Sequence, residues 1–218
     1  MDDKSKPSVR GELTRDALLE AATLAFAREG FGPANLREIA QAAEVNQALI
    51  GYHFHGKEGL YLAVFERLVA RIRQDFDPIL AGIDQLLQEP EAAPERCLEA
   101  LLGLVEGVLL HMVHEHPAWC ELVLREQQTP GPAYDLLYRE VIARHHGAMF
   151  DLLRKLRPGE DTGRVRLLAA TIASQALAVR HSRVPMMRLL GWDAIGPREL
   201  DLLKAMIRRN TTLLALGD

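Results

Sequence analysis

A short run of hydrogen-bonding side chains lies between residues 46 and 57 of this 218-residue chain. It contains side-chain amides, a phenol, imidazoles and an ammonium group, and its main members are Asn46, Gln47, Tyr52, His53 and Lys57. A side-chain amide can form two hydrogen bonds to the edge of one base, and the other groups can donate hydrogen bonds to phosphate oxygens. These residue types are therefore suited to hydrogen-bonded recognition of bases and phosphates.

The residues around this run, from Pro33 to Lys57, predict two short helices joined by a tight turn. Asn35 is placed to cap the first helix with its side-chain oxygen, and Glu38 is placed to complete a capping box. Asn46 is the candidate cap of the second helix. Apolar residues recur at helical spacing on one side of each helix, at Leu36, Ile39, Ala40 and Ala43 and then at Leu49, Ile50 and Phe54. The pattern is that of a helix-turn-helix, whose second helix enters the major groove of double-stranded DNA.

The polar side of the second helix holds the predicted base-reading residues. Gln47 is the best candidate, because its amide can contact adenine through two hydrogen bonds. Asn46, Ala48 and Gly51 lie on the same side; Gly51 either admits close approach of the DNA or is simply tolerated in the helix. Tyr52 and His53 are predicted to contact phosphate, although Tyr52 has the alternative of a core aromatic residue. The polar side therefore predicts one base-reading residue flanked by phosphate contacts.

Two helix starts are predicted to bind phosphate. The positive charge of Lys57 is unfavourable at the start of a helix, where the helix dipole is also positive. A nearby phosphate would make it favourable, because the lysine and the free N–H groups would bind the same anion. Asn35 and Arg37 form a similar pair at the start of the first motif helix. The two starts predict further phosphate contacts on either side of the base-reading helix.

The turn of the motif departs from the usual residue choice at Glu44. This position favours positive φ, for which glycine carries no Cβ penalty. A glutamate that adopts a left-handed conformation costs about 1 kcal/mol. We therefore expect a strained residue at Glu44 without loss of the motif.

Composition describes an ordinary globular protein of one or two domains, with 48% hydrophobic and 26% charged residues. The net charge is −4, and residues 1–60 carry seven basic and nine acidic side chains. DNA binding would therefore require the few cations to gather on one face. No uncharged apolar run approaches the roughly 20 residues of a membrane span, and the N-terminus lacks a signal-peptide core. We expect a cytoplasmic protein without a membrane partner.

The pattern predicts an all-α fold, with helices and breaks in regular succession. Residues 1–11 are predicted to form a polar arm with Lys4, Lys6 and Arg10, and residues 89–94 a linker. Cys97 and Cys120 lack metal-ligand spacing, so we expect buried free thiols. The predicted helices, with Pro78 as a break or kink, are Thr14–Glu29, 57–77, 79–88, 95–114, 117–127, 133–156, 162–183 and 197–214, with short helical content between 185 and 196.

Five histidines invite a metal interpretation, because imidazoles at a spacing of three share a helix face: His111, His114, His116, His145 and His146. We expect them instead to be capping and surface residues, because no cysteine or carboxylate stands beside them at a convincing ligand spacing. No metal, cofactor or catalytic residue is therefore predicted. A helical metallo-hydrolase that uses this cluster, and a helical interaction protein without DNA binding, are the rival classes.

The order of these elements resembles the TetR family of transcriptional regulators. The resemblance covers about residues 12–65 and rests on FAREG (26–30), LREIA (36–40), Val45 and Asn46, and above all YHFHGKEGL (52–60). Weaker similarity in LREQQTPGPAYDLL and RLLGW suggests the subgroup with a CecR-like C-terminal domain. The resemblance implies a DNA-binding domain at residues 1–56 and a helical effector-binding and dimerisation domain at 57–218, and it implies that the tyrosine at position 52 donates to the DNA backbone.

The resemblance further implies a repressor that a small apolar or antibiotic-like molecule releases from a palindromic operator. The helices from Glu95 to Leu156 would form the effector chamber. Because a single unit contacts only about four to six base pairs, we expect a dimer on an inverted repeat. The candidate effector-binding residues are His111, Trp119, Gln127, Tyr134, Tyr138, His145 and Gln175.

The best candidates for the dimer contact are the last two long helices. Ala169, Ala173 and Ala176 would allow close helix approach, and Arg208 and Arg209 would rim the contact. Burial of these apolar faces within one subunit is the alternative.

Overall fold

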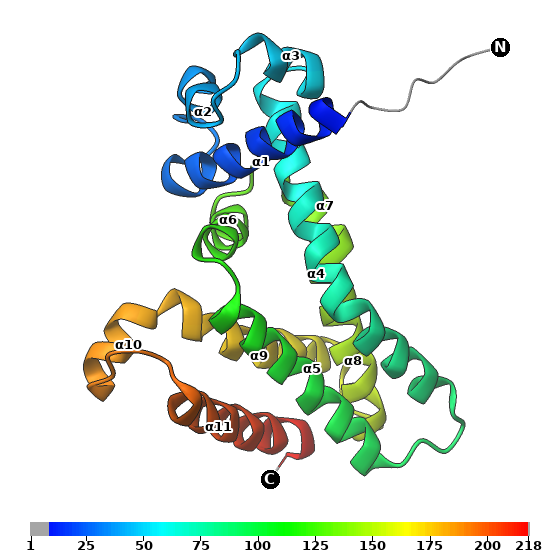
Figure 1. Cartoon of the computed structure of the whole chain (residues 1–218). Helices are drawn as coiled ribbons and strands as arrows, with labels where there is room; N and C mark the ends of the chain where they lie inside the picture. The colour runs from blue at the N-terminus through cyan, green and yellow to red at the C-terminus, as the bar shows by residue number, and fades with distance from the viewer. Residues whose placement is uncertain (1–8, 218) are drawn as a thin grey trace, which may run out of the picture. The chain divides into compact units, whose positions relative to one another are not determined.

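The computed structural model describes residues 9–217, and all regular secondary structure in that range is helical, which confirms the all-α prediction (Figure 1). The elements are α1 (Val9–Glu29), α2 (Leu36–Ala42), α3 (Ala48–Phe54), α4 (Lys57–Gln88), α5 (Pro94–His114), α6 (Pro117–Gln128), α7 (Tyr134–Leu137), the π-helix η1 (Tyr138–Ile142), α8 (Ala143–Leu156), α9 (Thr162–His181), α10 (Arg183–Leu190) and α11 (Pro197–Leu216).

The described chain forms two compact units that are not continuous in sequence. The first contains residues up to 70 together with 116–137, and the second contains residues 71–115 and 138 onwards. Helix α4 contributes residues to both units. The expected functional boundary between residues 56 and 57 stays a prediction, because these units follow packing and not the order of the chain.

Aromatic residues form the centre of the first unit. Tyr61 of α4 is fully buried and meets Phe26 of α1 edge-on, with ring centroids 4.9 Å apart. Phe31, in the loop after α1, packs back on this unit, with its ring 5.0 Å from the Tyr61 ring. Offset and edge-on aromatic pairs stabilise beyond the area that they bury. The start of α4 is thereby fixed against α1.

Helix α6 completes the first unit, although it follows Tyr61 by more than 50 residues. Its Glu126 is buried and accepts a hydrogen bond of 2.6 Å from the Tyr61 hydroxyl and one of 2.9 Å from the Gly131 amide. The neighbouring Arg125 donates to the Ala27 carbonyl at 3.1 Å. A buried carboxylate is tolerated only when such donors replace water. Helix α6 is therefore joined to both α1 and α4.

The second unit is built around α5, which lies beside α9 and α11 (Figure 1) and also contacts α8. Helix α5 is long and apolar enough to cross a membrane by length and composition, but its apolar residues Leu101, Leu104, Val105 and Leu109 are buried inside this unit. The pattern is that of a core helix. Cys97 and Cys120 are free and buried, as predicted.

Two predicted boundaries were wrong. Helix α1 begins at Val9, so Thr14 lies inside it and does not cap it, while residues 1–8 of the predicted arm lie outside the described residues. Pro78 does not break α4, whose buried face continues from Phe76 to Leu80 and Ile83 across it. Packing on both sides of a proline can offset the lost backbone hydrogen bond.

The helix expected over 133–156 contains the π-helix η1 between α7 and α8. The segment 185–196, expected as a break with short helical content, contains most of the short helix α10, which ends at Leu190 and is capped by Gly191 in a left-handed conformation. The extra residue of a π-turn shifts the faces of the helix that follows it. Sequence periodicity does not reveal such a shift.

The junction between α3 and α4 requires glycine at position 59. A Cβ atom at Gly59 would lie 1.8 Å from the Phe54 carbonyl oxygen, which is backbone and cannot rotate away. Gly82, in the same helix, has open space around the corresponding position. The two glycines therefore have different roles. Gly59 permits a close approach of backbone, whereas Gly82 only weakens its helix.

We expect Gly59→Ala to lower the free energy of unfolding by about 1–3 kcal/mol, the usual range for overpacking. The matched control Gly82→Ala should raise it by roughly 0.5–1 kcal/mol, because alanine loses less backbone entropy in a helix. Urea unfolding followed by circular dichroism, at one protein concentration, measures both. Equal effects of the two substitutions would show that the Phe54 contact does not constrain the junction.

Candidate functional site

The turn between α2 and α3 has the geometry that the sequence predicted. Glu44 has φ of 55°, so a non-glycine residue does occupy the left-handed conformation. Asn35 caps α2 by accepting from the Arg37 amide at 2.9 Å. Asn46 accepts from the Ala48 amide at 2.8 Å beside the start of α3, but the N-cap of the helix is Gln47, whose side chain makes no cap bond. Because the bond from Ala48 uses the side-chain oxygen of Asn46, the side-chain NH₂ group is the part that remains for recognition of DNA.

Helix α3 separates a buried side from an exposed side. Ile50 and Phe54 are buried, whereas Gln47, Ala48, Gly51 and Tyr52 are exposed. Tyr52 keeps 76% of its surface, so its alternative as a core aromatic residue was wrong. Its ring meets His53 edge-on at 4.9 Å between centroids. The predicted polar side is therefore available on the surface of this unit.

Lys57 and Arg37, the two predicted phosphate-binding cations of the motif, differ in their surroundings. The Lys57 ammonium donates to the Gly32 carbonyl oxygen at 2.7 Å and lies 5.3 Å from the centre of the Phe31 ring. Arg37 is exposed. Since an ammonium has three donors, Lys57 can hold the loop after α1 and still donate elsewhere. Its role is thus structural as well as electrostatic.

Arg15 is a cation near the motif that the sequence interpretation missed. Its guanidinium lies 5.4 Å from the centre of the Phe54 ring, at the last residue of α3. Arg15 belongs to α1 and is itself exposed. The spacing within residues 33–57 carries no signal for this contact, because tertiary packing alone brings α1 to the end of α3.

The predicted effector-binding residues are divided between the two units. Trp119, Gln127 and Tyr134 belong to the first unit, where the Arg67 guanidinium lies 5.8 Å from the centre of the Trp119 ring system. His111, Tyr138, His145 and Gln175 belong to the second unit. Members of the second group line two cavities or lie in the core, and the single chamber stays a prediction.

The larger cavity of the second unit has a volume of about 450 Å³. It holds Tyr138 of the predicted set and adds residues that the sequence interpretation did not select. The Arg166 guanidinium lies 5.7 Å from the centre of the Phe150 ring, and both residues line the cavity. The residues that line it are Tyr138, Ile142, Ala143, His146, Gly147, Phe150, Arg166 and Ala169. The volume suits a small organic molecule.

His145 and Gln175 are placed in the interior instead. The His145 ring packs edge-on against Phe76 at 4.6 Å, and burial lowers its pKa to about 4. Its Nε2 atom and the Nε2 atom of Gln175 are buried without a hydrogen-bond partner among the described residues. His145 is therefore a neutral core imidazole at neutral pH, and not a surface histidine.

The remaining histidines also differ from one another in their hydrogen-bond partners and neighbours. His116 caps α6 by accepting from the Ala118 amide at 3.2 Å, and a hydrogen bond of 2.8 Å joins Nδ1 of His146 to the Ile142 carbonyl oxygen. His111 alone among the five joins carboxylates in a group with metal-ligand geometry within the described residues.

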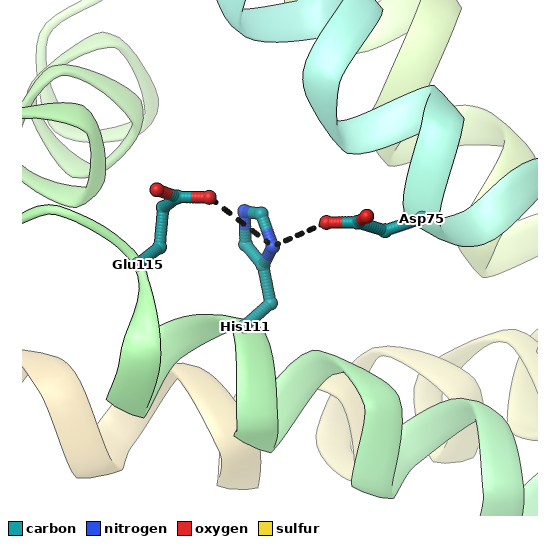
Figure 2. Close-up of side chains that lie close together, drawn as sticks. All are labelled: Asp75, His111 and Glu115. Atoms are coloured by element: carbon teal, nitrogen blue, oxygen red, sulfur yellow. Dashed lines mark ion pairs between the residues drawn. The ribbon is translucent and has the colours of Figure 1, made fainter.

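The expectation that no carboxylate stands at a convincing ligand spacing beside the histidines missed Glu115, four residues after His111. Figure 2 shows the His111 ring between Asp75 of α4 and Glu115 at the end of α5. Nδ1 of His111 lies 3.7 Å from an Asp75 oxygen and 4.0 Å from a Glu115 oxygen. The spacing of four between His111 and Glu115 was a readable signal, whereas Asp75 arrives by tertiary packing. The three residues line the smaller cavity of the second unit, with a volume of about 290 Å³.

Comparison with known proteins agrees with this architecture. Residues 18–64 match the model of the tetR family of bacterial regulatory proteins, and residues 98–217 match the C-terminal domain of the HTH-type transcriptional dual regulator CecR. That regulator from Shigella flexneri is 26% identical over 213 residues, which are 96% of this chain and 95% of the relative. The HTH-type transcriptional repressor NicS of Pseudomonas putida is 30% identical over 56% of this chain and 52% of its own length.

A solved TetR-like transcriptional regulator from Rhodococcus sp. RHA1 has the same fold, with a TM-score of 0.62 at 19% identity over 94% of this chain and 97% of the other. The two family models together cover both the helix-turn-helix and most of the C-terminal helices. The chain therefore belongs to the TetR family of DNA-binding transcriptional regulators, which are not enzymes, and carries a CecR-like C-terminal domain.

Proposed function

We propose that this regulator is a cytoplasmic repressor that binds an inverted-repeat operator through α3 and is released by a small molecule. The exposed polar side of α3 is the observation that carries this proposal, since Gln47 and Tyr52 extend from it while Ile50 and Phe54 fix its other side. Base contacts specify sequence, and phosphate contacts set register. One relative is named as a dual regulator, so the experiments should also test for activation at some operators.

The proposed roles differ along the surface. Gln47 reads a base edge, with Asn46, Ala48 and Gly51 beside it, and Tyr52, His53, Lys57, Asn35 and Arg37 contact the backbone. Gly51 has no atom within 4 Å of the position of an added Cβ, so its small size is not required by packing within the chain. Arg15 adds a further cation beside α3. The chain as a whole is acidic, so only a few cations are available for contacts with the DNA backbone.

We expect Gln47→Ala to change the preferred base at one position in each half-site, because a lost bidentate contact costs roughly 1–3 kcal/mol of discrimination. Tyr52→Phe and Lys57→Ala should weaken binding to all operators about equally. Genomic footprinting followed by binding to single-base operator variants measures both effects. Unaltered base preference in Gln47→Ala would contradict its role, and unfolding measured in parallel separates the Lys57 contact with Gly32 from its effect on DNA.

We further propose that a homodimer forms through α9 and α11, on different faces from those expected. Ala169, Ala173 and Ala176 are buried within the chain, so they cannot supply the contact. The guanidinium of Arg208 is paired with Glu106 and Glu99 of α5. An exposed apolar stripe remains on α11, at Leu202, Met206, Leu213 and Leu216.

The exposed side of α9 suits close helix approach. Leu167, Thr171 and Ser174 follow one another at helical spacing on this side. The hydroxyls of Thr171 and Ser174 donate back to the carbonyls of Leu167 and Ala170 at 2.8 Å. Their polar groups are thereby satisfied within the helix, and a small surface faces outwards. Such small outward residues allow two helices to pack at short distance.

Light scattering at micromolar concentration should give twice the chain mass of 24.3 kDa for the wild type. Met206→Glu should weaken the dimer at least about tenfold, since an unpaired charge would be buried in the contact. The matched control is Leu24→Glu, at an exposed leucine of α1 in the other unit. A monomeric wild type, or equal weakening by both substitutions, would contradict the proposed interface.

We propose the larger cavity of the second unit as the effector site. Tyr138 and Phe150 supply aromatic surface, and His146 and Arg166 supply polar groups beside it. The π-helix that carries Tyr138 follows α7, and π-turns are often found at functional sites. The chain leads from this π-helix back through residues 131–137 to Glu126, which bonds to Tyr61 of the DNA-binding unit. An effector would shift operator affinity by its differential affinity for two arrangements of this segment.

Filling the cavity by Phe150→Trp should abolish release from the operator by apolar or antibiotic-like compounds while operator binding without effector is retained. Leu189→Trp, which enlarges a side chain exposed on α10 outside the cavity, is the control. A compound library screened by thermal shift and then by operator release provides the measurement. A full response in Phe150→Trp, or no response to any compound in the wild type, would reject this site.

A further inference from the structure

Three potential metal ligands from two helices converge beside the smaller cavity of the second unit (Figure 2). Asp75 comes from the middle of α4, and His111 and Glu115 lie one helical turn apart at the end of α5. Each offers one ligand atom, and the three atoms lie within 4.8 Å of one another. None of the three is needed for the proposed contacts with DNA, the dimer or the effector.

The charges of this group are not balanced within it. Two carboxylates face one imidazole ring, so acidic side chains outnumber the imidazole in this group. The Arg71 guanidinium approaches Glu115 at 3.3 Å and compensates one carboxylate. The cluster therefore retains an excess of negative charge beside a cavity.

The geometry suits a small cation more closely than it suits a direct ion pair. The nitrogen-to-oxygen distances of 3.7 and 4.0 Å are long for hydrogen bonds. Two ligands that share one tetrahedral ion at about 2.0–2.2 Å from each lie roughly 3.3–3.6 Å apart, so a bound ion would draw the carboxylates slightly closer to the ring. Asp75 is 52% exposed and can rotate towards the ring, whereas His111 and Glu115 are 10% and 12% exposed and are held by packing.

We propose that Asp75, His111 and Glu115 bind one divalent transition-metal ion of the Zn²⁺ class. One imidazole nitrogen and two carboxylate oxygens form a mixed set that suits Zn²⁺ and its neighbours better than Mg²⁺ or Ca²⁺, which take all-oxygen sites. Because the ligands come from two helices, the bound ion cross-links α4 to α5. The cavity leaves further coordination positions open to water.

The test uses the full chain after dialysis against EDTA. Calorimetric titration with Zn²⁺ should give one ion per chain, and Co²⁺ should give visible absorption bands from its bound state. Asp75→Asn, His111→Gln and Glu115→Gln should each weaken binding by more than the roughly 10- to 100-fold that loss of an outer-shell partner costs. Zn²⁺ should also raise the melting temperature of the wild type, because it binds only the folded protein.

His114→Gln is the matched control. His114 lies one turn from His111 in α5, lines the same cavity and is exposed, but it does not belong to the ligand group. Its loss should leave the affinity for Zn²⁺ within about twofold, which is below 1 kcal/mol. Circular dichroism of each variant without metal shows whether the fold is retained.

A further variant separates the metal site from a permanent ion-pair network. Arg71→Gln removes the cation that competes for Glu115, so it should keep or tighten Zn²⁺ binding. Weakening by Arg71→Gln comparable to that of the ligand variants would overturn the proposal. So would less than one ion per wild-type chain, or unchanged affinity in folded Asp75→Asn and Glu115→Gln.

Discussion

The hydrogen bond between the Tyr61 hydroxyl and Glu126 is the interaction on which the organisation of the DNA-binding unit depends. Both groups are buried, so each would leave an unsatisfied polar atom without the other. Burial, followed by this bond, raises the pKa of the tyrosine hydroxyl far above its usual range, so it stays a donor. The Tyr61 ring at the same time packs against Phe26, Phe31 and Phe65.

This interaction explains why a helix late in the sequence belongs with the helix-turn-helix. Glu126 also accepts from Gly131, and a Cβ at Gly131 would lie 2.6 Å from the carboxylate. The loop after α6 is thereby fixed to the same carboxylate that holds α4. The segment leading to the proposed effector cavity begins at this loop. The proposed regulation would therefore be transmitted in two ways. The backbone connects the loop after α6 to the effector cavity, and the hydrogen bond of Glu126 connects α6 to α4.

The second unit uses polar residues in a different way. His145 is a neutral ring packed edge-on with Phe76, whereas His111, which also meets the Phe76 ring, faces two carboxylates. Two imidazoles on one phenyl ring therefore have different surroundings, one apolar and one anionic. Sequence spacing treats these histidines alike. Only the elements packed around each ring decide which is a core residue and which is a ligand candidate.

The sequence by itself determined the all-α class, the helix-turn-helix with its cap at Asn35, the strained turn at Glu44 and the family. These features depend on contacts within a few residues, which spacing and capping chemistry encode directly. It also identified α9 and α11 as the proposed dimer helices, but it selected the faces that the structure buries. A periodic apolar stripe shows which face avoids water, and it does not show whether the same chain or a second copy covers that face.

Tertiary structure alone decided the contacts between residues far apart in the chain. It brought Arg15 to α3, Glu126 to Tyr61 and Asp75 to His111, and it divided the predicted effector residues between separate places. It also carried α4 through Pro78, because buried residues on both sides outweigh the local penalty of proline. The physical reason is the same in each case: the free energy of packing is shared among distant residues, and no local pattern records which of them will meet.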